Sequence, residues 1–141
     1  MSRSTVRTSA MVAAAGFLVI ASFQVALALG APFGRAAYGG AHEGQLPTAL
    51  RISSAVAVGV WVLAALTVLA RAGLRVVPLP RPVVRGGLWV FVVLLFVGAA
   101  MNFASPSGWE RYGWGPLALG LGVICLFVAR KTPNPSSTGS G

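Results

Sequence analysis

The polar side chains that could bind a ligand or do chemistry are few, and most lie in two stretches between apolar segments. The candidates are Arg35, His42, Glu43, Arg51, Asn102, Glu110, Arg111 and Trp114. The whole chain has two acids and one histidine, too few for the three or four ligands of a zinc site at any recognised spacing. It also lacks the second histidine that a bis-histidine haem needs. We therefore expect a polar cluster with a binding or structural role, without a metal, a cofactor or a catalytic residue.

An ion pair is one role that the sequence predicts for the two acids. Arg51 lies about one turn inside the apolar segment that follows Pro47, where an unpaired cation is costly. We expect Glu43 or Glu110 to be its partner. Pairing between the two acids and the three arginines of these stretches would fold the loops over the end of the helices.

A helix cap is the competing role for Glu110. Ser107-Gly108-Trp109-Glu110 matches a capping box, in which the serine oxygen accepts from the Glu110 amide and the carboxylate reaches back to the Ser107 amide. The box requires a helical turn that begins before Pro116, which would then kink or restart the helix. One carboxylate does not fully serve both a cap and an ion pair, and the sequence leaves the two roles open.

Four apolar segments must position this cluster. Of 141 residues, 56% are hydrophobic and only 9% are charged, against about 25% charged in a soluble domain, which excludes an ordinary soluble globule. A helix needs about 20 apolar residues to cross about 30 Å of hydrocarbon. Segments of that kind span about 10–30, 48–70, 86–104 and 112–129. Barrel strands are shorter and alternate, so we predict an all-α bundle of four transmembrane helices over residues 1–131.

The basic residues predict which side of the membrane each end faces. One side receives Arg3, Arg7, Arg71, Arg75, Arg81, Arg85, Arg130 and Lys131. The opposite side receives the other three arginines and both acids. By the positive-inside rule, both termini are cytoplasmic and the polar cluster is extracytoplasmic. Cations at the ends of apolar runs also argue against a nucleic-acid partner, so the lipid bilayer is the expected one.

Three further segments carry predictions of their own. The first apolar segment has a second interpretation as a cleaved signal peptide, because Arg3 and Arg7 precede it and Ala26-Leu27-Ala28 resembles a cleavage site. The length of the segment favours a retained helix. Pro78-Leu79-Pro80-Arg81-Pro82 has too many prolines for a helix and is predicted to be an extended strap. Residues 132–141 have no apolar groups to bury and are predicted to be a disordered cytoplasmic tail.

The two extracytoplasmic loops resemble each other. Arg35-Ala36-Ala37-Tyr38-Gly39 and Arg111-Tyr112-Gly113-Trp114-Gly115 both read Arg, two residues, an aromatic residue and Gly. Pro47 and Pro116 follow, each placed to occupy the first turn of the returning helix. These matches suggest two parallel helical hairpins related by duplication, and chance similarity in a chain rich in Ala, Leu and Gly is the alternative.

Two motifs are distinctive enough to suggest a family. They are Leu46-Pro47-Thr48-Ala49-Leu50-Arg51 and Asn102-Phe103-Ala104-Ser105-Pro106-Ser107-Gly108-Trp109-Glu110-Arg111, the latter followed by Trp114 and Pro116. With them the chain resembles an uncharacterised family of small four-helix integral membrane proteins from high-GC, actinobacteria-like bacteria. The resemblance covers most of residues 30–130. It implies a topology and no activity, and it assigns no catalytic residue.

The sequence therefore predicts a small integral membrane protein that is not an enzyme. We expect either an accessory subunit with a membrane-protein partner, or a binder of lipid head groups or small ligands at the polar cluster. One alternative is an oligomeric small-solute transporter or channel in which Gln24 and Asn102 face a pore. Another is an outward-facing membrane enzyme that uses His42 as a general base. The sequence does not determine the oligomeric state.

Overall fold

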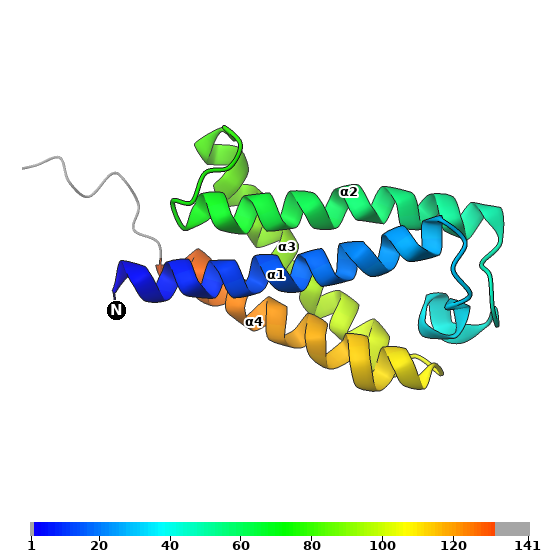
Figure 1. Ribbon diagram of the computed structural model, residues 1–141. Helices are drawn as coiled ribbons and strands as arrows, with labels where there is room; N and C mark the ends of the chain where they lie inside the picture. The colour runs from blue at the N-terminus through cyan, green and yellow to red at the C-terminus, as the bar shows by residue number, and fades with distance from the viewer. Residues whose placement is uncertain (1, 132–141) are drawn as a thin grey trace, which may run out of the picture.

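The structure, a computed structural model, describes residues 2–131, which form four helices in two antiparallel hairpins (Figure 1). The helices are α1 (Arg3–Ala28), α2 (Thr48–Arg71), α3 (Arg81–Ala104) and α4 (Gly115–Lys131). Two 3₁₀ turns, η1 (Gly34–Ala36) and η2 (Tyr38–Gly40), lie between α1 and α2, and a π-helical turn, η3 (Glu110–Trp114), leads into α4. Residues 2–131 contain no strand, so the predicted all-α four-helix bundle is confirmed.

The first helix begins at Arg3, earlier than the predicted start near residue 10. Ser2 caps it, because the serine hydroxyl oxygen accepts a hydrogen bond from the backbone N–H of Thr5 at 3.4 Å. A capped first turn lets polar residues continue the helix beyond the apolar segment. The predicted disordered tail, 132–141, lies outside the described residues.

The third helix begins at Arg81, before the predicted start near residue 86. Pro82 occupies its first turn, where the missing N–H has no intrahelical acceptor to lose. The prediction of an extended strap over residues 78–82 is therefore wrong at its C-terminal end, because Pro80 is the residue at which the helix is capped.

The fourth helix is preceded by a helical turn that starts at Gly108, as the capping-box motif requires. Pro116 lacks an N–H, and its ring would crowd the preceding turn of a regular helix. The chain widens there: the N–H of Gly115 bonds to the carbonyl oxygen of Glu110, five residues back. The regular helix α4 thus begins at Gly115, later than the predicted start near residue 112.

The two loops with similar sequences have different conformations. Residues 34–40 form 3₁₀ turns, whereas residues 110–114 form a π-helical turn. Pro116 lies in the first turn of α4, as predicted, but Pro47 is the cap of α2, one residue before the helix. The duplication of the hairpins stays a prediction.

The two ends of the bundle differ in the segments that lie there, as Figure 1 shows, and in the number of basic residues that those segments carry. The N-terminus of α1, the connection between α2 and α3, and the C-terminus of α4 lie together at one end, here named the basic end. The α1–α2 loop, 29–47, and the α3–α4 connection, 105–109, lie at the other, here named the loop end. All four helical segments are long and apolar enough to cross a membrane, by length and composition.

The core is small and the outward surface of the helices is apolar. The largest side chains that are fully buried include Phe17, Leu88, Leu95, Val68 and Val128. Large aliphatic side chains also face outward, for example Val56 and Val90, which are 65% and 64% exposed. An apolar exterior of this extent is unusual for a protein in water, and it is what lipid covers in a membrane-spanning bundle.

Glycine allows α1 and α4 to approach closely. A Cβ atom placed on Gly16 would lie 2.6 Å from a methyl carbon of Leu121, which is itself buried. At Gly122 of α4, the corresponding contact with Leu95 is an ordinary one at 3.4 Å. A residue larger than glycine at position 16 would therefore require Leu121 to move.

A small second core lies beneath the α1–α2 loop. Its buried residues are Leu27, Ala37 and Leu46. The loop closes where the N–H of Gly34 donates to the carbonyl oxygen of Gly44 at 2.9 Å. A Cβ atom on Gly34 would lie 2.0 Å from the carbonyl oxygen of His42, so this turn requires glycine. The loop is thus a packed element able to hold side chains in place.

Candidate ligand-binding site

Glu110 is a buried carboxylate that joins the two hairpins. The residue is 8% exposed, and its two carboxylate oxygens accept from the backbone N–H of Gly39 at 3.1 and 3.2 Å. The hydroxyl of Ser105 donates a further hydrogen bond to it. Gly39 has a φ of 79°, a conformation that favours glycine. The turn at Gly39 therefore presents its N–H to a residue at the start of the fourth helical segment.

The predicted capping box is half formed. The hydroxyl oxygen of Ser107 accepts from the backbone N–H of Glu110 at 3.4 Å, as predicted. The carboxylate does not reach back to the Ser107 amide, because Gly39 and Ser105 supply its donors. The Ser107 amide instead donates to the hydroxyl oxygen of Ser105 at 3.1 Å. Ser105, which sequence reasoning missed, thus bridges the two halves of the cap.

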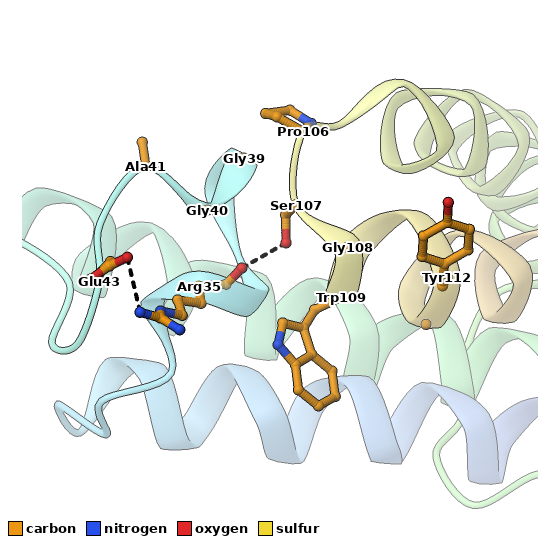
Figure 2. A pocket seen from close by; sticks show the side chains of 11 residues that line it. Arg35, Gly39, Gly40, Ala41, Glu43, Pro106, Ser107, Gly108, Trp109 and Tyr112 are labelled. Atoms are coloured by element: carbon orange, nitrogen blue, oxygen red, sulfur yellow. Dashed lines mark hydrogen bonds and ion pairs between the residues drawn. The ribbon is translucent and has the colours of Figure 1, made fainter.

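Ser107 also holds the α1–α2 loop. Its hydroxyl donates to the backbone carbonyl oxygen of Arg35 at 2.6 Å (Figure 2). Together with the bonds of Glu110, this contact fixes the loop onto the start of the fourth segment.

The prediction that Arg51 pairs with an acid is wrong. Its Nε donates to the carbonyl oxygen of Ala28 at 3.1 Å. The last carbonyls of a helix have no intrahelical donor and carry partial negative charge, so the C-terminus of α1 supplies the partner that we expected from Glu43 or Glu110.

The acids and arginines do not form the predicted network. Within residues 2–131 one ion pair joins Arg35 and Glu43 at 3.0 Å, and both side chains are well exposed, at 67% and 74% (Figure 2). A surface pair of this kind contributes little to stability. Glu110 has no cation within ion-pair distance in this part of the chain, and Arg111 is exposed without a side-chain partner there.

The surface around that ion pair is an open, shallow pocket between the α1–α2 loop and the α3–α4 connection. Arg35, Glu43, Ser107, Trp109 and Tyr112 are among the residues that line it (Figure 2). Trp109 and Tyr112 are 68% and 78% exposed, as expected for aromatic side chains at a membrane interface. The side chain of His42 is exposed and has no hydrogen-bond partner among the described residues, so nothing there orients it as a base.

A more enclosed cavity of about 320 Å³ lies between the helices beneath the loop end. Its polar lining residues are Gln24 of α1, Asn102 of α3 and Glu110. Its aromatic lining residues are Phe23, Tyr38, Trp61 and Trp114. The other residues that line it are aliphatic or small. The cavity thus receives three of the polar side chains singled out from the sequence, from three different helical segments.

The two amides in this cavity have no partner in the fold. The side-chain oxygen of Gln24 is buried and accepts no hydrogen bond within residues 2–131. The side chain of Asn102 likewise makes none within these residues. A buried polar atom without a partner is costly, and the side-chain oxygen of Gln24 is such an atom. Neither side chain therefore contributes a hydrogen bond to the stability of the described structure.

The aromatic residues of the cavity are held by other contacts. The hydroxyl of Tyr38 lies 3.0 Å from that of Ser54 and donates to the carbonyl oxygen of Leu50 at 3.3 Å. The indole N–H of Trp114 donates to the carbonyl oxygen of Ala36 at 3.0 Å, and its ring lies 4.7 Å from that of Phe23. These rings are thus fixed in position.

Trp61 is one of the lining residues that sequence reasoning passed over. It lies near the middle of α2, on the same helical face as Ser54 and Ala57. A tryptophan four residues after Ala57 and seven after Ser54, both small, was a signal that could have marked it.

Two further results limit what can be carried over to this site. Within residues 2–131, no three His, Cys, Asp or Glu side chains are placed to hold a metal ion together. Comparison of the chain with models of protein families, with curated proteins and with solved structures found no match. The resemblance to a family of small four-helix membrane proteins therefore stays a prediction.

Proposed function

We propose that the protein is a small integral membrane protein that binds a small ligand or a lipid head group, without catalysing a reaction. The cavity beneath the loop end is the proposed site. One observation carries this proposal: Gln24 and Asn102 line the same cavity, and the buried side-chain oxygen of Gln24 has no hydrogen-bond partner within residues 2–131. Polar groups inside an apolar bundle are costly unless they are paired, so a ligand that bonds to both would relieve that cost.

The fixed surroundings of the amides also support binding. The loop above the cavity is held to the fourth segment by Glu110 and Ser107, and two of the rings are held by their own hydrogen bonds. A site whose walls are already in place loses less conformational entropy when a ligand binds. Because both amides face one cavity within a single chain, this arrangement favours a binding site over a pore between chains.

The proposed orientation follows from charge. With the basic end in the cytoplasm, as the positive-inside rule favours, both termini are cytoplasmic and the cavity lies at the extracytoplasmic side. A ligand would then reach it from outside the cell or from the outer leaflet of the bilayer.

The experiment is to extract the protein in native-like lipid particles and identify what copurifies by mass spectrometry. We expect a small molecule or lipid enriched with the wild type and lost from the double variant Gln24→Leu/Asn102→Leu. Gln45→Leu is the matched control, because it makes the same change at an exposed glutamine outside the cavity. Identical small molecules with the wild type and the double variant would refute the proposal. A protein that copurifies in their place would favour the accessory-subunit role.

A further inference from the structure

We infer that the occupant of this cavity is a primary ammonium group, carried by a free small amine or by an amine-bearing lipid head group. The inference rests on the proposed function and adds the chemical class of the ligand. Three properties of the cavity lead to it: its charge, its aromatic lining and its unused hydrogen-bond acceptor.

The charge of the cavity is opposite to that of the protein. The chain has 11 basic residues and a formal net charge of +9, yet no arginine or lysine lines the cavity. Its one charged lining residue is Glu110, whose donors are a backbone N–H and a hydroxyl, both neutral. A carboxylate in a site lined mainly by apolar groups attracts a cation more strongly than one in bulk water, because the local dielectric constant is lower.

The aromatic lining suits a cation as well. Phe23, Tyr38, Trp61 and Trp114 contribute four rings to one cavity. The hydroxyl of Tyr38 and the indole N–H of Trp114 are already used within the protein, so what these two residues offer a ligand is mainly ring surface. Ammonium groups bind to the electron-rich faces of such rings, with tryptophan the best partner.

The unused acceptor distinguishes a primary ammonium from a quaternary one. The buried side-chain oxygen of Gln24 lacks a donor. A primary ammonium has three N–H donors, whereas a tetraalkylated nitrogen has none. An anionic ligand would face the Glu110 carboxylate without any cation in the lining to offset the repulsion. The volume of about 320 Å³ is near the lower end of the range for ligand pockets, which fits a head group or a small amine.

The test uses the full-length protein in nanodiscs of phosphatidylglycerol, titrated with ethylamine at neutral pH. Binding is followed by the shift in thermal unfolding temperature. We expect ethylamine to stabilise the protein in a saturable way. Tetramethylammonium should stabilise it only at concentrations about tenfold higher or more, because this cation offers no charge-assisted hydrogen bond. Acetate and ethanol should not stabilise it.

The variants Gln24→Leu and Trp61→Leu should each weaken ethylamine binding by about tenfold or more while the protein stays folded. Trp89→Leu is the matched control, since Trp89 lies on α3 outside the cavity and is part exposed; it should bind ethylamine as the wild type does. Equal stabilisation by acetate or ethanol, or wild-type ethylamine binding by both cavity variants, would overturn the inference.

Nanodiscs with added phosphatidylethanolamine separate the two sources of the ammonium group. If a lipid head group is the ligand, the added phosphatidylethanolamine should compete with ethylamine and raise the ethylamine concentration needed for stabilisation. If a free amine is the ligand, the added lipid should have no such effect.

Different results would refute the binding function and the ammonium inference. A copurifying ligand that depends on Gln24 and Asn102 but has no amine refutes the ammonium inference alone, whereas the absence of any such ligand refutes the binding function.

Discussion

The backbone N–H of Gly39 donates to both carboxylate oxygens of Glu110, at 3.1 and 3.2 Å. This contact crosses from the loop of the first hairpin to the start of the last membrane segment. It accounts for a buried acid that has no cation partner in residues 2–131, and it places Glu110 in the wall of the cavity. Four predictions test this contact and the arrangement around it.

Replacing Glu110 with glutamine should lower the free energy of unfolding by about 1–3 kcal/mol. The amide group keeps one acceptor oxygen but turns an N–H₂ donor toward groups that are themselves donors. Denaturant or thermal unfolding of the purified protein in detergent measures the change. Glu43→Gln serves as the control, because Glu43 is exposed and its loss should change stability by less than about 0.5 kcal/mol. Equal effects of the two variants would contradict the assigned role.

Gly39→Ala should destabilise the protein by about 1–2 kcal/mol, because a φ of 79° places a Cβ atom close to its own backbone. No neighbouring atom lies within 4 Å of that Cβ position, so the cost comes from the backbone alone. Gly59→Ala has equally free space but lies inside α2, where the same change should be stabilising by about 0.5–1 kcal/mol. Unfolding curves that shift in the same direction would argue against the left-handed turn.

Gly16→Leu should destabilise the bundle by about 1–3 kcal/mol through overpacking, because the new side chain meets buried Leu121. Gly120→Leu makes the same substitution on α4 at an exposed position with nothing within 4 Å, and it should leave the unfolding temperature nearly unchanged. A tolerated leucine at residue 16 would mean that α1 and α4 are not in close contact there.

The proposed orientation predicts the labelling of two engineered thiols by a reagent that does not cross membranes. His42→Cys, at the loop end, should react in intact cells, and Pro80→Cys, at the basic end, should react only after the cells are permeabilised. The native Cys125 is buried and should give little background. The reverse pattern would invert the topology, and labelling of both sites in sealed cells would rule out a transmembrane arrangement.

The fold was largely predictable from composition, because helices are the simplest way for a long apolar segment to satisfy its own backbone in lipid. The positions of the helix ends were not, since polar residues such as Ser2 extend a helix past its apolar part. Pro82 shows the same limit: a proline that breaks a helix interior is tolerated in a first turn.

The polar residues of the site were identified from the sequence, but their partners were not. Arg51 was expected to pair with an acid, and Glu110 either with an arginine or with the Ser107 amide. Arg51 instead binds the backbone carbonyl of Ala28, and Glu110 binds the backbone N–H of Gly39 and the hydroxyl of Ser105. Backbone donors and acceptors carry no mark in a sequence, because every residue type has the carbonyl and every one but proline has the N–H. Which ones are free depends on where turns and helix ends lie in space, and that requires the fold.

The 71 residues that separate Gly39 from Glu110 also set an order of assembly. The first hairpin is synthesised in full while its loop still lacks the acceptor that the finished protein gives to Gly39. The hydrogen bonds of that loop with Glu110 form only after the last segment has been made. A chain that ended before residue 110 would contain α1, α2 and α3 but would lack the cavity wall that Glu110 contributes.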